Sequence, residues 1–170
     1  MQCNAGILCT HGCVTKYIIG VGWDRKLTFF EDTRLKKVTS ARQVPAGRMA
    51  HEQDILACAL MLDSPNMVTA AADGSLKVWN VESGSLRKTL VVRADHVPNH
   101  KQAIEALVFM HGPQLKQMLI AVGAEQMARW WDIKHCVLQH QMFTGVDVAT
   151  QCLPLPQLLV LKRHHYMHAS

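Results

Sequence analysis

Three segments of the chain repeat one arrangement of apolar and polar positions. They are residues 18–32 (IIGVGWDRKLTFFED), 67–81 (MVTAAADGSLKVWNV) and 119–133 (LIAVGAEQMARWWDI), which align without gaps. In each segment a short apolar run meets a polar turn, and a second run with alternating apolar and polar positions follows. Two such runs around a tight turn predict a β-hairpin. The aromatic residues Phe30, Trp79 and Trp131 recur at intervals of 49 and 52 residues, so the chain contains an internal repeat.

Further predicted strands flank the hairpins. An apolar run at 55–60 follows His51, and a similar run at 104–109 follows His100, 49 residues later than the first histidine. Behind the second hairpin, a Ser-Gly turn leads into a fourth run at 86–92. The spans 55–60, 67–72, 76–81 and 86–92 are therefore expected to form one antiparallel sheet. The predicted fold class is all-β, built from four-stranded units such as the blades of a β-propeller.

On these residues the chain resembles the WD-repeat family. Residues 51–80 carry the resemblance with a histidine, two strands, an Asp-Gly turn and the ending LKVWN, and Trp131-Asp132 is the dipeptide of the family name. The resemblance covers about residues 17–144 and implies an incomplete β-propeller of four-stranded antiparallel blades. The segments GWDRK and HEQDIL are also similar to WD-repeat and EF-hand proteins of cilia and sperm flagella, although no EF-hand calcium loop occurs in the sequence.

The repeat divides the chain into successive parts. Residues 1–16 form an atypical N-terminal segment, 17–44 a partial repeat without its first strand, 51–92 a complete repeat and 100–144 another repeat. Residues 145–161 start a further repeat, and 162–170 form a basic, histidine-rich tail. A propeller needs at least about four blades, so we expect a fragment or truncated isoform of a larger propeller protein. Its terminal blades should expose apolar side chains and favour self-association. The expected exposed residues are Ile18, Ile19 and Phe29 at one end and Leu158, Leu159 and Leu161 at the other.

The resemblance implies a buried hydrogen-bond relay in the second repeat. Its members, in order, are Trp79, Thr69, His51 and Asp73. The four groups are chemically compatible, because an indole N–H only donates, a hydroxyl donates and accepts, an imidazole bridges, and a carboxylate accepts. The third repeat has Ala121 in place of the threonine, so it cannot complete such a relay.

A histidine, a threonine and an aspartate together also suggest a hydrolase triad. The chain contains no nucleophile-elbow motif, however, and the other repeats lose members of the set. Cysteines at positions 3, 9 and 13 lack the paired spacing of a structural zinc site. We therefore expect no enzyme activity, no metal site and no cofactor. A hydrolase or metal enzyme that uses the histidines is the alternative, and it needs three ligands or triad groups in one pocket.

Composition and charge add expectations about location and partners. Of 170 residues, 49% are hydrophobic and 18% are charged, and the longest apolar run, at 55–62, is too short for a membrane-spanning helix. The sequence has no secretion signal, so we expect reduced cysteines and an intracellular, cytoplasmic protein. The second resemblance implies a ciliary or flagellar cytoskeleton instead. The net charge of +5 makes nucleic-acid binding through basic residues within 25–48 an alternative function.

The expected function is that of a non-catalytic scaffold that mediates protein–protein interactions. The resemblance places Trp23, just before the turn aspartate of the first repeat, on the rim where partners dock. Arg25 lies two residues further along. Tryptophan and arginine are enriched at interface hot spots, which makes the two residues the candidate partner-binding site. In the other interpretation, Trp23 packs over the neighbouring blade.

Overall fold

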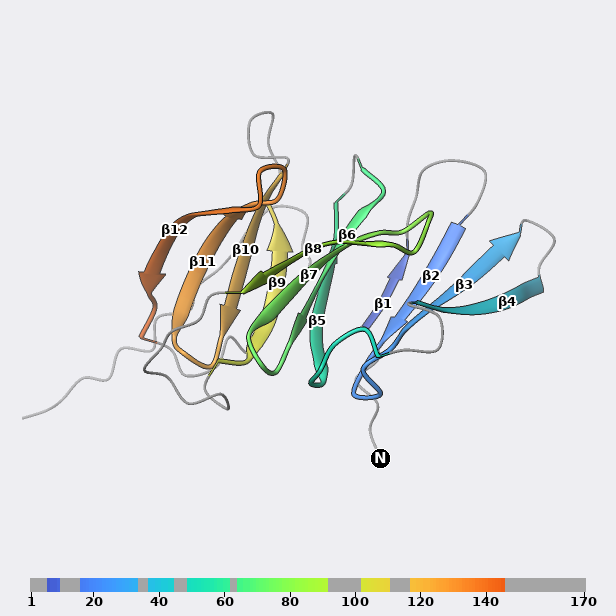
Figure 1. The fold of residues 1–170 in the computed structure, drawn as a ribbon, viewed down its shortest axis with the longest axis horizontal. Coiled ribbons are helices and arrows are strands. Elements are labelled where there is room, and N and C mark those ends of the chain that lie inside the picture. Colours follow the sequence, from blue (N-terminus) through green and yellow to red (C-terminus); the bar gives the residue numbers. More distant parts are fainter. Residues whose placement is uncertain are drawn as a thin grey trace, which may run out of the picture.

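The computed structural model describes residues 6–9, 16–33, 37–44, 49–61, 64–91, 102–110 and 117–145. Within this part of the chain, all regular structure is β-strand, and the strands form three antiparallel sheets of four (Figure 1). In each sheet, strands that follow one another in the sequence are also hydrogen-bonded neighbours, so every sheet is a meander. None of the described residues forms a helix long and apolar enough to cross a membrane.

The twelve described strands divide equally among the three sheets. The first sheet consists of β1 (Gly6–Cys9), β2 (Lys16–Val21), β3 (Leu27–Thr33) and β4 (Lys37–Val44). The second consists of β5 (Ile55–Leu60), β6 (Asn66–Ala71), β7 (Ser75–Asn80) and β8 (Leu86–Val91). The third consists of β9 (Ile104–Phe109), β10 (Met118–Gly123), β11 (Met127–Asp132) and β12 (Val137–Phe143).

The all-β fold class and the four-stranded sheet of the second repeat are confirmed. Each strand from β5 to β8 agrees with its predicted span to within one residue at either end, and β9 has the predicted bounds. The prediction that the first repeat lacks its first strand is wrong, because β1 pairs antiparallel with β2, with Gly6 opposite Val21. The strand was missed because it has only four residues and no histidine in front of it. The further repeat at 145–161, apart from Gly145, and the tail at 162–170 lie outside the described residues.

One turn geometry recurs in the hairpins β2–β3, β6–β7 and β10–β11. In each turn the N–H of the fourth residue donates to the carbonyl oxygen of the first at 3.1 Å. The fourth residue has a positive φ in every case, 60° at Arg25, 80° at Gly74 and 59° at Gln126. A β-turn followed by a left-handed residue is a common hairpin connection. The three aligned segments therefore have the same backbone conformation at their turns. This holds even in the first and third turns, where the left-handed residue is not a glycine.

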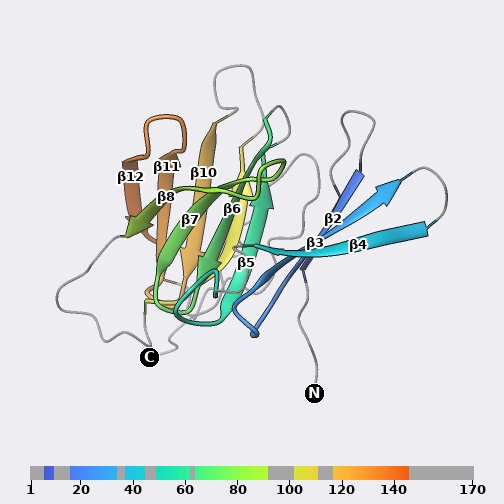
Figure 2. The same cartoon turned by 45° about the vertical axis from the view of Figure 1, so that its right-hand side comes forward.

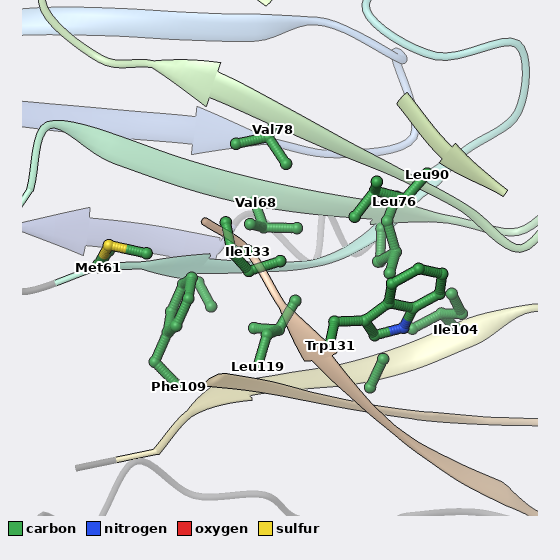
Figure 3. Close-up of a cluster of buried hydrophobic side chains, with 13 residues drawn as sticks. Met61, Val68, Leu76, Val78, Leu90, Ile104, Phe109, Leu119, Trp131 and Ile133 are labelled. Carbon is green, nitrogen blue, oxygen red and sulfur yellow. The ribbon is translucent and has the colours of Figure 1, made fainter. Parts of the chain in front are cut away.

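The three sheets follow one another through the molecule (Figures 1 and 2). Apolar side chains form a layer between each sheet and the next. Residues of β6 alternate between two of these layers, with Met67 facing the first sheet and Val68 facing the third. A strand buried on both faces needs apolar residues at consecutive positions, which explains the run MVTAA. Figure 3 shows the layer between the second and third sheets, where Val68, Leu76 and Val78 meet Leu119, Trp131 and Ile133. A third cluster, Ile120, Val122 and Ala128, lies on the far face of the third sheet.

The exposure predicted for the first sheet is wrong. Ile19 and Phe29 are 0% and 2% exposed, because their face of the sheet packs against Met67 and Trp79 of the second sheet. The sequence pattern identified an apolar face but not the side on which the next sheet lies. The side chain of Ile18 in β2 is not described, and Leu158, Leu159 and Leu161 lie outside the described part of the structure.

The first and fourth strands differ in their surroundings. The first strands lie next to one another, since β5 packs beside both β1 and β9. The fourth strands β8 and β12 are largely solvent-exposed, and β12 has no buried residue. Neighbouring sheets therefore contact one another through their first strands and through their faces, while β8 and β12 lie on the outside.

Candidate functional site

A chain of hydrogen bonds links three of the four predicted relay residues. Nε1 of Trp79 donates to Oγ1 of Thr69 at 2.9 Å, and the same oxygen lies 2.6 Å from Nε2 of His51. The other ring nitrogen of His51, Nδ1, lies 3.0 Å from Oγ of Ser75. All four side chains are buried. Because both ring nitrogens of His51 face hydroxyl groups, which can donate or accept, a neutral imidazole satisfies both contacts.

The predicted contact between His51 and Asp73 is wrong, because Ser75 occupies that place. Oδ1 of Asp73 instead accepts a hydrogen bond from the backbone N–H of Ser75 at 2.9 Å. A contact two residues along the chain is typical of an aspartate that stabilises its own turn. The sequence did contain a signal for the serine, since Ser75 follows the turn glycine and lies on the same face of β7 as Lys77 and Trp79.

Burial lowers the pKa of His51 to about 4; the positive charge of Lys77 acts in the same direction, and the carboxylate of Asp73 opposes it. The imidazole is therefore neutral near pH 7. Nζ of Lys77 donates to the backbone oxygen of Ala50 at 2.8 Å, next to the histidine. These bonds connect the β6–β7 hairpin with the segment before β5, which indicates a role in holding the sheet together.

The third sheet has a different polar arrangement at the equivalent place. Ala121 offers no hydroxyl, and Nε1 of Trp131 is buried without a hydrogen-bond partner among the residues that the structure describes. Arg129 and Glu125 form a buried ion pair instead. Nε of Arg129 is also buried and unpaired within the described ranges. Among the described residues, Trp131 therefore has no partner for a relay like that of the second sheet. His100 lies outside the described residues.

The candidate partner-binding residues Trp23 and Arg25 have different surroundings. Trp23, in the β2–β3 turn, is 54% exposed, which favours the rim interpretation over packing against the neighbouring sheet. Arg25 contacts the segment before β5, with Nε 3.3 Å from Oδ1 of Asp54 and Nη1 2.9 Å from the backbone oxygen of Glu52. The backbone oxygen of Arg25 also accepts a bond from Ala50 at 2.6 Å. Arg25 thus joins the first sheet to the second.

The alternative metal site and the alternative nucleic-acid site lie only partly within the described residues. Within the described ranges, no three His, Cys, Asp or Glu side chains gather as metal ligands would. Residues 3 and 13 lie outside those ranges, as does the side chain of residue 9. Of the basic side chains within 25–48, only those of Arg25 and Lys26 are described, and Arg25 already pairs with Asp54.

The sequence matches no protein-family model and no curated protein. Three features of the chain bear on its function: the recurring four-stranded sheet, the buried hydrogen bonds of the second sheet and the exposed tryptophan at the β2–β3 turn.

Proposed function

We propose that the three sheets are consecutive blades of a WD-repeat β-propeller and that the chain is a non-catalytic scaffold for other proteins. The recurrence of one unit carries the proposal. Each sheet is a four-stranded meander, and the three equivalent turns each have a left-handed residue at the same position. The first strands β1, β5 and β9 lie side by side, and the fourth strands β8 and β12 lie on the outside. This arrangement is the one expected of blades around a common axis.

The buried hydrogen bonds of the second sheet support a structural role over a catalytic one. Thr69 is 0% exposed and His51 is 1% exposed, so a substrate has no access to the threonine hydroxyl. A nucleophile has to contact its substrate, and its histidine has to accept a proton at the working pH. The low pKa of His51, about 4, does not suit that task near pH 7.

The exposed turn residues support a binding role. Loops carried by a rigid scaffold are common binding surfaces, and a half-exposed tryptophan is a typical hot-spot residue. Trp23 lies on a turn whose backbone is fixed to the next sheet by the hydrogen bond between Arg25 and Ala50. A turn whose backbone is already fixed loses less conformational entropy on binding. Trp23 is thus the residue that we assign to partner contact, with Arg25 as its support.

Affinity capture combined with cross-linking tests this proposal. The full chain serves as bait in a cell extract, beside Trp23→Ala and the control Val137→Ala, which removes a 48% exposed apolar side chain from β12. We expect specific proteins that cross-link near the β2–β3 turn and are lost with Trp23→Ala but kept with Val137→Ala. If no protein is retained by the unchanged chain, the scaffold proposal is wrong. If Trp23→Ala keeps every partner, the assignment of Trp23 is wrong.

A further inference from the structure

A second surface, far from Trp23, lies between the second and third sheets. A cavity of about 310 Å³ opens there, at the ends of the sheets opposite the β6–β7 and β10–β11 turns. This volume is at the lower end of the range of about 300 to 1,000 Å³ that is usual for ligand pockets. It is sufficient for a side chain and the backbone next to it, but not for a large cofactor.

The floor of the cavity is apolar. Met61, Val78 and Ile133 line it, and all three belong to the buried layer between the two sheets (Figure 3). Their side chains are therefore fixed by packing on the inner side and border the cavity on the other. Such a floor favours a ligand that brings an apolar group of its own.

The rim of the cavity is positively charged. Arg87 and Lys88 at the start of β8, together with Lys134 in the β11–β12 turn, contribute to the lining. The lining includes no carboxylate among the described residues, and none of the three cations forms an ion pair with a described carboxylate. All three are exposed, so their charge is available to an approaching anionic group.

Asn66 contributes an unpartnered hydrogen-bond acceptor beside the cavity. Its Oδ1 atom is buried and has no hydrogen-bond donor in the part of the chain that the structure describes, and the residue lines the cavity. A buried acceptor without a donor costs about 1 to 3 kcal/mol. Rotation of the side-chain amide toward the cavity would present this oxygen to a ligand donor such as the backbone N–H of an extended peptide.

We propose that this cavity binds an extended acidic segment of a partner protein. One apolar side chain of the segment lies on the floor, a backbone N–H donates to Oδ1 of Asn66, and flanking carboxylates meet the cations of the rim. A free phosphate would meet the charges but not the apolar floor, and nucleic acid lacks an aliphatic side chain. The inference rests on the proposed scaffold function and specifies the chemistry of one partner.

Fluorescence anisotropy with a defined probe tests the inference. The probe is a labelled peptide in which one leucine is flanked on both sides by glutamates, titrated with the full chain. We expect saturable binding that weakens with added salt, and no binding of the same peptide with lysines in place of the glutamates. Lys88→Glu and Lys134→Glu should each raise the dissociation constant about fivefold or more, because like charges then face each other. Lys26→Glu, the same charge change on the first sheet, should alter it less than about twofold.

Asn66→Ala separates the ligand contact from a structural effect. Its Oδ1 atom has no described partner to lose, so the melting temperature should not fall, while probe binding should weaken. The inference is overturned if the probe does not bind, if Lys134→Glu binds it as well as the unchanged chain does, or if a single-stranded oligonucleotide displaces it as the tighter ligand. Capture through Trp23 is measured separately. If the unchanged chain captures partner proteins but does not bind the probe, only this inference is refuted. If it captures no partner protein, the scaffold proposal is refuted.

Discussion

The hydroxyl of Thr69 accepts a hydrogen bond from the indole nitrogen of Trp79 at 2.9 Å, across the β6–β7 hairpin. The same oxygen lies 2.6 Å from His51, which precedes β5. One hydroxyl therefore connects two strands with the segment that leads into the sheet. All three residues are at most 1% exposed, so water cannot replace any of these contacts.

Replacement of the hydroxyl by a methyl group should weaken the second sheet. Thr69→Val keeps the shape of the side chain but leaves the N–H of Trp79 and one ring nitrogen of His51 without a partner. We expect the free energy of unfolding to fall by about 1 to 3 kcal/mol. Urea denaturation measures the change. Thr89→Val on the exposed strand β8 is the matched control and should stay within about 0.5 kcal/mol of the unchanged chain. An equal effect of the two variants would contradict the structural role of the relay.

The depressed pKa of His51 predicts a pH dependence of stability. The folded state holds the pKa at about 4, and the unfolded value is 6.5. Between these values the unfolded chain binds a proton that the folded chain does not, so stability falls as the pH falls from about 6.5 to about 4. His51→Gln should remove this slope, as urea titrations at several pH values would show. The lowered pKa of Asp132, caused mainly by its hydrogen bond with His135, acts below its ordinary value of 3.8 and does not interfere. An unchanged slope in His51→Gln would assign the pH dependence to other groups.

The strands were predictable because the pattern of apolar positions follows directly from two-sided burial. In β6, where Met67 and Val68 face different layers, the consecutive apolar run and the Asp-Gly turn left little freedom for another assignment. The short strand β1 has no such turn glycine or aromatic end, so pairing with β2 alone determines it. The face of the first sheet that Ile19 and Phe29 occupy depends on where the second sheet lies, which no local pattern contains.

Only the part of the relay whose side chains lie on one face of a strand pair was predictable. Thr69 and Trp79 lie on paired strands, and the residue classes suggest their hydrogen bond. The acceptor or donor opposite Nδ1 of His51 depends on the exact course of the turn, where Ser75 and Asp73 are two residues apart. Both can bond to an imidazole, and only the folded backbone decides between them. The partners of Arg25 in the segment before β5 were equally inaccessible, because they depend on how two sheets pack.

The unpaired indole of Trp131 predicts a stabilising substitution in the third sheet. Ala121 pairs with Arg129 in the same register in which Thr69 pairs with Lys77, so a threonine at 121 would place a hydroxyl where Trp79 finds one in the second sheet. Ala121→Thr should be more stable than Ala121→Val, its counterpart of equal size without the hydroxyl, by about 1 kcal/mol. Comparison of the two variants cancels the cost of the larger side chain. The indole N–H resonance of Trp131 should shift only in the threonine variant. Equal stability and an unmoved resonance would show that the hydroxyl does not reach the indole.

The left-handed turn residues predict opposite effects for two substitutions at equivalent positions. Gly74 has a φ of 80°, and a Cβ atom there would lie 2.8 Å from the backbone oxygen of Gln102, in front of the third sheet. Gly74→Ala therefore adds a steric clash to the backbone strain and should lower stability by more than about 1 kcal/mol. Gln126, at a φ of 59°, already carries that strain, so Gln126→Gly should raise stability by about 0.5 to 1 kcal/mol.

Thermal and urea denaturation of these two variants test whether the three turns are equivalent. Gly22→Ala is the control, because its Cβ would meet only Oδ1 of Asp24, at an ordinary 3.9 Å, and its φ is not positive. We expect Gly22→Ala to change stability far less than Gly74→Ala. If Gln126→Gly destabilises the chain, the side chain of Gln126 contributes more than its backbone strain costs, and the turns of the second and third sheets are then equivalent in geometry but not in energetics.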